Sequence, residues 1–166
     1  MNIIFLDVDG VLNSLPYFKS IKGIKHDKYN EISDFHLKKL SEIYYKCNAH
    51  IVLSSTWREL DDPSDINCYP MYEYLSKSLD KYGMKIISKT PVINMNRPLE
   101  IVTWLNNRTD KEIINFVSLD DDFSVEDYER YGIADKLIRT KFFCNDIYEG
   151  GLQQEHVDKA IRILTN

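Results

Sequence analysis

Short apolar runs alternate along the chain with stretches in which apolar residues recur every three or four positions. We expect strands at the apolar runs, which cover residues 2–6, 50–53, 85–88, 113–119 and 136–142. The helical spacing covers residues 33–47, 71–82, 98–107, 124–131 and 154–164. Ser33 is a suitable N-cap for the first helix, and Gly83 and Gly132 are suitable residues to end the second and the fourth.

Strands that alternate with helices predict an α/β fold, namely a three-layer Rossmann-like parallel sheet with helices on both faces. The runs at residues 3–6 and 51–53 are continuously apolar, as in strands that are buried on both faces. A length of 166 residues suits a single domain over residues 1–166. We interpret residues 58–70 as a loop and residues 14–32 as a loop or a small insertion over the edge of the sheet.

Charge and cysteine content restrict the partners and the compartment. The formal net charge of −5 provides no broad basic surface, so no stable complex with nucleic acid is expected. The three cysteines, Cys47, Cys68 and Cys144, are widely spaced and odd in number, which indicates reduced thiols in a cytoplasmic protein. No run approaches the ~20 apolar residues of a membrane-spanning helix, and Asp7 ends the first apolar run too early for a signal peptide.

Acidic residues follow two of the predicted strands. Asp7 and Asp9 come after the first, and Asp120 and Asp121 come after the fourth, with Asp122 next to them. Because ligands bind at the carboxyl ends of the strands in an open parallel sheet, we expect these carboxylates to converge. Their mutual repulsion calls for a hard divalent cation, and all-oxygen ligands favour Mg²⁺. On its own, Asp-x-Asp-Gly is more often a turn, and the second acidic group is what favours a metal site.

Groups that can bind phosphate follow the second strand and open the third helix. Ser54 and Ser55 come directly after residues 51–53, and the Ser54 hydroxyl can donate to a phosphoryl oxygen or cap the next element. Arg97 lies at the start of a helix, where the helix dipole disfavours a cation, so a bound phosphate and the acidic group would explain its position. The alternatives are a surface arginine at this position and Lys89 as the phosphate-binding cation.

These residues resemble the four motifs of the haloacid dehalogenase (HAD) superfamily of phosphatases. Residues 7–13 (Asp-Val-Asp-Gly-Val-Leu-Asn) resemble its first motif, Ser54 its second, Arg97 its third and residues 116–121 its fourth. The four follow in the family's order and span most of the chain. Residues 54–58 (Ser-Ser-Thr-Trp-Arg) and Gly151-Leu152 are similar to a subgroup related to the HAD domain of RNA-repair proteins.

The resemblance implies a hydrolase that acts on phosphoric ester bonds. Asp7 would be the nucleophile, and Asp9 would act as acid and then as base. Mg²⁺ would be held by Asp7, by the backbone carbonyl of Asp9, and by Asp120 or Asp121. Ser54, Ser55 and Arg97 would bind the phosphoryl oxygens. Gly10 would allow a close approach of the backbone.

The spacing between the motifs leaves no room for a full cap domain, so the site is expected to be open or nearly so. By analogy with the family, an open site suggests a large substrate, such as a nucleic-acid end or a protein, or a partner subunit that closes the site. The expected substrate is a phosphorylated small molecule or a nucleic-acid end. An aromatic and basic stretch follows the first motif, at residues Tyr17, Phe18, Lys19, Lys22 and Lys25. It either binds a phosphorylated polymer or is a solvated loop. A phosphotransferase or phosphomutase, a dehalogenase and a binding module with a decayed site are the other functions considered.

Overall fold

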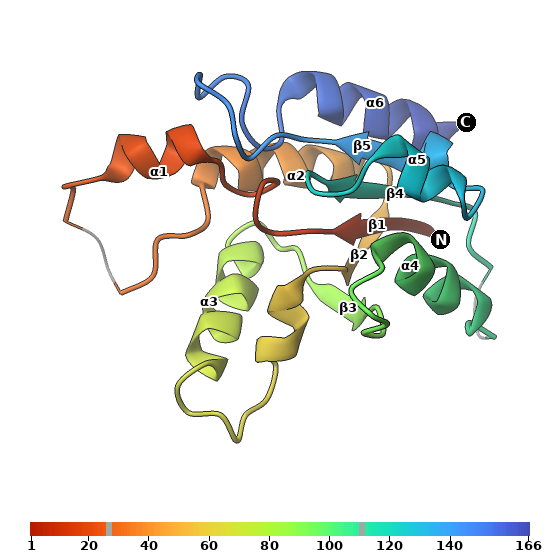
Figure 1. Cartoon of the computed structure of the whole chain (residues 1–166), viewed down its shortest axis with the longest axis horizontal. Helices are drawn as coiled ribbons and strands as arrows, with labels where there is room; N and C mark the ends of the chain where they lie inside the picture. Colours follow the sequence, from red (N-terminus) through yellow and green to blue (C-terminus); the bar gives the residue numbers. More distant parts are fainter. Residues whose placement is uncertain (26–27, 110–111) are drawn as a thin grey trace.

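The computed structural model describes residues 1–25, 28–109 and 112–166. Five parallel strands form one sheet in the order β3-β2-β1-β4-β5 (Figure 1). The strands are β1 (Asn2–Leu6), β2 (Ala49–Leu53), β3 (Ile86–Lys89), β4 (Asn115–Asp120) and β5 (Leu137–Arg139). The predicted α/β class and parallel sheet are therefore confirmed.

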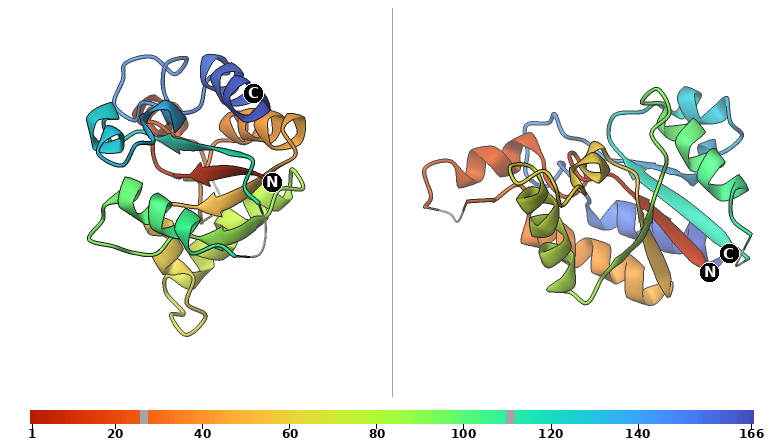
Figure 2. Two further views of the ribbon diagram at one scale, coloured as in Figure 1. Left: turned by 90° about the vertical axis from the view of Figure 1, so that its right-hand side faces the viewer. Right: turned by 90° about the horizontal axis from the view of Figure 1, so that it is seen from below.

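Helices cover both faces of the sheet, as Figure 2 shows in two further views. Helices α2 (Asp34–Lys46) and α6 (Gln154–Thr165) pack against each other and against one face. Helices α4 (Arg97–Asn106) and α5 (Val125–Glu129) contribute to the core on the other face. Helix α3 (Tyr69–Asp80) adds to the core that α2 and α6 share. The expected three layers are present.

The side chains of β1 alternate between the two cores. Ile4 and Leu6 belong to the core under α2 and α6, whereas Ile3 and Phe5 belong to the core under α4 and α5. All four are fully buried. This alternation is the period-two geometry of a strand, and burial on both faces explains the continuous apolar run at residues 3–6.

The register of the sheet brings three strand ends to one level. Leu6 pairs with Leu53 of β2 and with Leu119 of β4. The residues that follow are therefore neighbours, and two backbone hydrogen bonds continue the ladder past the strands: Ser54 N–H donates to the Leu6 carbonyl, and Asp7 N–H donates to the Leu119 carbonyl. Between β1 and β4 the order of the sheet reverses, and ligands bind at this kind of position in open α/β sheets.

Two segments that were predicted to be loops contain helices. Residues 15–21 form helix α1 (Leu15–Ile21), so the loop prediction for residues 14–32 is wrong there; residues 26–27 lie outside the described residues. Ser14 caps α1 by accepting a hydrogen bond from Tyr17 N–H, and Pro16 lies in its first turn. A 3₁₀ helix, η1 (Thr56–Leu60), covers the start of the second segment, and α3 covers its end.

The other differences from the sequence prediction concern where strands and helices begin and end. Strand β5 is shorter than the predicted run because the 3₁₀ helix η2 (Ala134–Lys136) precedes it and Thr140 ends its register. Within the described residues, each helix is too short or too polar to cross a bilayer.

Candidate active site

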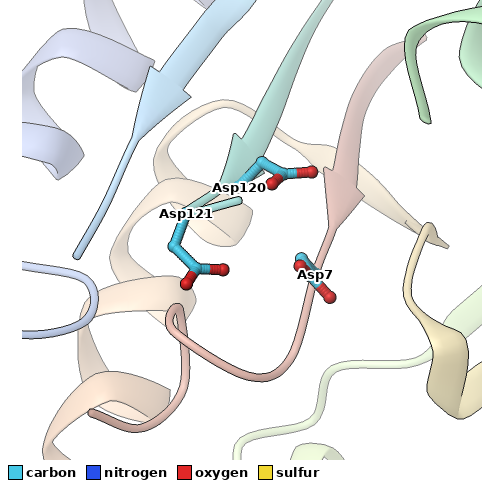
Figure 3. A group of neighbouring side chains, drawn as sticks. All are labelled: Asp7, Asp120 and Asp121. Carbon is cyan, nitrogen blue, oxygen red and sulfur yellow. The ribbon is translucent and has the colours of Figure 1, made fainter. Parts of the chain in front are cut away.

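Three carboxylates meet at the end of β1 and β4 (Figure 3). Each of Asp7, Asp120 and Asp121 has an oxygen within 4.8 Å of the other two. Asp120 is fully buried and Asp7 is 7% exposed, while Asp121 is partly buried. The convergence of Asp7 with Asp120 and Asp121, which was inferred from topology, is therefore present in the fold.

The cluster is short of positive charge. Burial raises the pKa of Asp7, although the nearby Arg97 guanidinium opposes the shift. Burial also raises the pKa of Asp120 to about 6, again against Arg97 and with a further contribution from the charge of Asp7. Burial and the charges of Asp7 and Asp120 raise the pKa of Asp121 to about 7. Carboxyl groups with pKas raised in this way are protonated more readily, and a cation among them would restore their ionised form.

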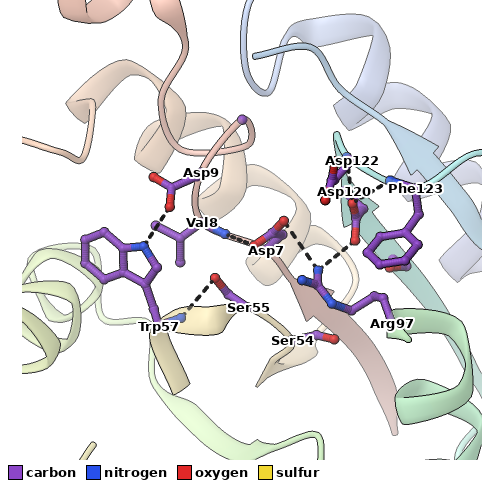
Figure 4. Close-up of polar contacts among 12 residues, drawn as sticks. Asp7, Val8, Asp9, Ser54, Ser55, Trp57, Arg97, Asp120, Asp122 and Phe123 are labelled. Carbon is purple, nitrogen blue, oxygen red and sulfur yellow. Dashed lines mark hydrogen bonds and ion pairs between the residues drawn. The ribbon is translucent and has the colours of Figure 1, made fainter. Parts of the chain in front are cut away.

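Arg97 is the cation that faces this cluster (Figure 4). Its Nη1 donates to Oδ2 of Asp120 at 2.7 Å and lies 3.3 Å from Oδ2 of Asp7. These two carboxylates hold the pKa of Arg97 above its usual value even though burial acts to lower it. The ion pairs explain why a buried cation is tolerated in the first turn of α4, and the alternative of a surface arginine is wrong.

The two serines after β2 have different surroundings. The Ser54 hydroxyl is buried and accepts a hydrogen bond from Oγ1 of Thr90 at 3.3 Å. The Ser55 hydroxyl accepts from the N–H of Trp57 at 3.4 Å and is the N-cap of η1. A hydrogen bond between the Ser55 side chain and Asp7 lowers the pKa of Asp7 and so opposes the effect of burial. The cap that the sequence placed at Ser54 is therefore formed by Ser55, next to Asp7.

Asp9 lies outside the acidic cluster and is held by two neutral donors. Nε1 of Trp57 donates to its Oδ2 at 2.9 Å, and Nδ2 of Asn13 donates to its Oδ1 at 2.9 Å. The Asn13 side chain is itself fixed, because its Oδ1 accepts from Gly10 N–H at 2.8 Å. The Asp9 carboxylate is thus aimed by two side chains whose role the sequence did not reveal. The predicted contact of Asp9 with the metal through its backbone carbonyl stays a prediction.

Gly10 lies directly against the acidic cluster. Its φ is +77°, and a Cβ at this position would overlap the Asp121 carboxylate. The predicted close approach of the backbone is therefore confirmed, because any other residue would be strained and would displace Asp121.

Lys89 and Asp122 complete the predicted candidates. Lys89 forms an ion pair with Asp61 at 2.6 Å, so its charge is already matched. Asp122 is exposed, and its backbone N–H donates to Oδ1 of Asp120 at 2.9 Å. Among the described residues, the cluster of possible metal ligands contains Asp121 and does not contain Asp122.

A buried ion pair between Arg58 and Glu100 lies next to the site and was not predicted from the sequence. Nη2 of Arg58 donates to Oε2 of Glu100 at 2.9 Å, and Nη1 donates to the Ser55 carbonyl at 2.8 Å. Oε1 of Glu100 accepts from Ile93 N–H at 2.8 Å. Both side chains are almost fully buried. The pair ties the loop after β2 to the first turn of α4, which carries Arg97. The sequence signal was that Arg58 ends the Ser-Ser-Thr-Trp-Arg stretch at residues 54–58.

Comparison with known proteins agrees with this geometry. The profile of one family, described as the HAD domain in Swiss Army Knife RNA repair proteins, matches residues 3–157. No significant match was found among curated proteins or among solved structures. The matched range contains β4, all of β1 except Asn2, and all the site residues described above. This chain therefore belongs to the family of HAD domains found in Swiss Army Knife RNA repair proteins.

Proposed function

We propose that the chain is a Mg²⁺-dependent phosphomonoesterase that works through an aspartyl-phosphate on Asp7. The observation that carries this proposal is the meeting of Asp7, Asp120 and Asp121 with Arg97 at the carboxyl edge of the sheet. Asp7 would be the nucleophile, Arg97, which contacts Asp7 and Asp120, would bind an anion, and the three carboxylates could hold a metal ion. Family membership supports the same reaction class.

The donor set suits a hard divalent cation. All three acidic groups offer oxygen, and burial raises the pKas of Asp120 and Asp121 despite the nearby Arg97, so a further cation would stabilise their ionised form. Asp7, Asp120 and Asp121 would hold the ion, with the Asp9 carbonyl as a further ligand. When bound, it would supply the positive charge that offsets repulsion between Asp7 and a phosphate dianion.

The protein side of the reaction uses Asp7 and Asp9 in turn. An oxygen of Asp7 bonds to phosphorus while the ester P–O bond breaks, and Asp9 gives a proton to the leaving oxygen. Water then attacks the phosphorus of the aspartyl-phosphate, Asp9 takes its proton, and inorganic phosphate leaves with Asp7 restored. Ser54, Ser55 and Arg97 would bind the phosphoryl oxygens as charge moves onto them.

A generic aryl phosphate tests this proposal. We expect phosphate release that requires Mg²⁺ and stops with EDTA. Asp7→Asn should lower turnover by at least about 1,000-fold, since it removes the nucleophile. Asp122→Asn is the matched control, because this neighbouring acid is exposed and lies outside the cluster, and it should stay within a few fold of wild type. Wild-type turnover in Asp7→Asn would show that the nucleophile is another group.

The end of a polynucleotide is the substrate that family membership favours, because the matching family is named for RNA repair proteins. A phosphotransferase or phosphomutase would use the same Asp7 chemistry and pass the phosphoryl group to another hydroxyl. Product analysis in the presence of added alcohols or sugars separates the two activities. We expect inorganic phosphate as the product, and a new phosphate ester would indicate transfer.

A further inference from the structure

A cavity opens beside the acidic cluster. It has a volume of about 530 Å³, and it is lined by Asp121 and Asp122 and by residues 139–143 at and after the end of β5. This volume is in the usual range of about 300–1,000 Å³ for small-molecule sites. Because Asp121 belongs both to this wall and to the acidic cluster, a group in the cavity would lie next to the reacting phosphate.

Two residues that line this cavity, Phe142 and Phe143, belong to a row of neighbouring aromatic rings. The ring of Phe142 lies 4.9 Å from that of Phe143 and 6.2 Å from that of Phe18 in α1, measured between centroids. Tyr17 continues the row at 5.4 Å from Phe18. Phe143 is 80% exposed, so most of its surface is accessible to a ligand.

The segment that carries these rings is tied to the active-site loop. Leu15 N–H donates to the Phe142 carbonyl at 3.0 Å, which fixes the start of α1 against it. The Thr140 hydroxyl donates at 2.7 Å to the carbonyl of Gly10, the residue that follows Asp9. In Figure 1 both α1 and the segment after β5 lie beyond the carboxyl ends of the strands. The exposed ring is therefore presented on a framework shared with the catalytic loop.

Two cations next to these rings line the same cavity, which Asp121 and Asp122 also line. Arg139 and Lys141 line the cavity with Phe142 and Phe143, in a chain whose net charge is −5. Exposed aromatic faces next to cations match single-stranded nucleic acid, because bases stack on the rings and the cations contact the backbone phosphates. An acidic protein would gain from the cations but would leave the flat face of Phe143 without a matching partner.

We propose that Arg139, Lys141, Phe142 and Phe143, together with Phe18, form a ledge that binds the nucleotide next to the terminal phosphate of a single-stranded nucleic acid. The inference rests on the proposed function, because it places the terminal phosphate at Asp7. A base stacks on Phe143, and Lys141 contacts the next backbone phosphate. The ledge selects a polynucleotide end over a small phosphate ester.

Binding to a non-turnover variant tests the ledge separately from catalysis. The probe is a short fluorescent single-stranded oligoribonucleotide with a 3′- or a 5′-phosphate, and its Kd for Asp7→Asn is measured by anisotropy with Mg²⁺ present. When Phe143→Ala is combined with Asp7→Asn, binding should weaken by about tenfold, which is the loss expected for one stacked base. Adding Tyr148→Ala should leave the Kd unchanged, since Tyr148 is equally exposed but does not line the cavity. Adding Lys141→Gln should reduce the dependence of the Kd on salt by about one phosphate contact.

The outcomes separate the ledge from the proposed function. Equal Kd values for the Phe143→Ala and Tyr148→Ala proteins, or no binding of either probe, would overturn the ledge. If wild type still released phosphate in that case, the proposed function would stand alone. If the Kd depended on Phe143 while wild type released no phosphate from any ester, the ledge would stand and the proposed function would fail.

Discussion

Asp7 is buried and faces charged groups, whereas Asp9, two residues later, is exposed and held by neutral donors. Asp7 lies with Asp120 and Asp121 opposite Arg97. Asp9 accepts hydrogen bonds from the Trp57 indole and the Asn13 amide. Two identical side chains can take different chemical roles when their surroundings differ in this way. The Asp7 side of the site, formed by Asp7, Asp120, Asp121 and Arg97, suits a nucleophile beside a cation. The Asp9 side, formed by Asp9, Trp57 and Asn13, suits a carboxylate that must keep one orientation while it gains and loses a proton.

The two sides share one support. Arg58 directly follows Trp57, the residue that orients Asp9. The Arg58 guanidinium donates to Glu100, which lies in the same helix as Arg97. Each difference between the two aspartates therefore has a residue through which it can be tested.

Breaking the shared support should have the largest effect on stability. Glu100→Gln leaves the buried Arg58 guanidinium without a counter-charge, which costs roughly 3 kcal/mol by analogy with other broken buried ion pairs. Chemical denaturation measures this loss. Glu129→Gln, at an exposed position on α5, is the control and should cost less than about 0.5 kcal/mol. A Glu100→Gln protein as stable as wild type would show that the ion pair is dispensable.

Removing the indole donor should affect only the Asp9 side. Trp57→Phe keeps most of the buried ring but leaves Asp9 held by Asn13 and without the indole donor, so we expect kcat/KM to fall about tenfold for an alkyl phosphate. The loss should be smaller for p-nitrophenyl phosphate, whose leaving group needs less protonation. Trp104→Phe is the matched control, since this buried indole donates to Ser88 and does not contact the site. Equal losses in the two variants would assign Trp57 a structural role only.

Neutralising Asp121 should stabilise the metal-free protein at alkaline pH. Its pKa is raised to about 7 by burial and by Asp7 and Asp120, from an ordinary value of 3.8. Because the folded pKa lies above the unfolded one, stability falls as pH rises between about 4 and 7 and stays low above that range. At pH 8 in EDTA, Asp121→Asn should be more stable by about 1 kcal/mol after allowance for solvent screening, or about 2–4 °C in Tm.

Adding Mg²⁺ should reverse the order of these two proteins. Wild type should gain Tm with Mg²⁺ at pH 8, and Asp121→Asn should gain less, because a ligand that binds only the folded state stabilises it. An Asp121→Asn protein that melts below wild type in EDTA at pH 8 would contradict the charge imbalance described for the cluster.

The sequence predicted the Asp7 side better than the Asp9 side. Asp7, Ser54 and Asp120 each follow an apolar run, so a parallel sheet brings them together without any knowledge of side-chain packing. The contact between Trp57 and Asp9 depends on how η1 turns after Ser55, and no spacing rule specifies that turn. Arg58 was missed for a related reason: a buried arginine looks like a surface one until its partner Glu100 is seen.

The aromatic segment after the first motif shows the same limit. Phe18 lies in α1, whose cap at Ser14 and whose Pro16 were visible in the sequence, yet the mixed polar composition of residues 14–32 favoured a loop. Its packing against Phe142 joins residues far apart in the chain, and only the fold places them together.

Trapping the phosphorylated enzyme tests the two roles most directly. Each variant is mixed with a substrate that carries a radiolabelled phosphoryl group and is quenched in acid, which preserves an acyl phosphate. Asp9→Asn should retain label on the protein, because an activated leaving group allows Asp7 to be phosphorylated while the base for hydrolysis is missing. Asp7→Asn should retain none. Label on the Asp7→Asn protein, or its absence from Asp9→Asn while that variant still consumes substrate, would contradict the assignment of Asp7 as nucleophile and Asp9 as acid and base.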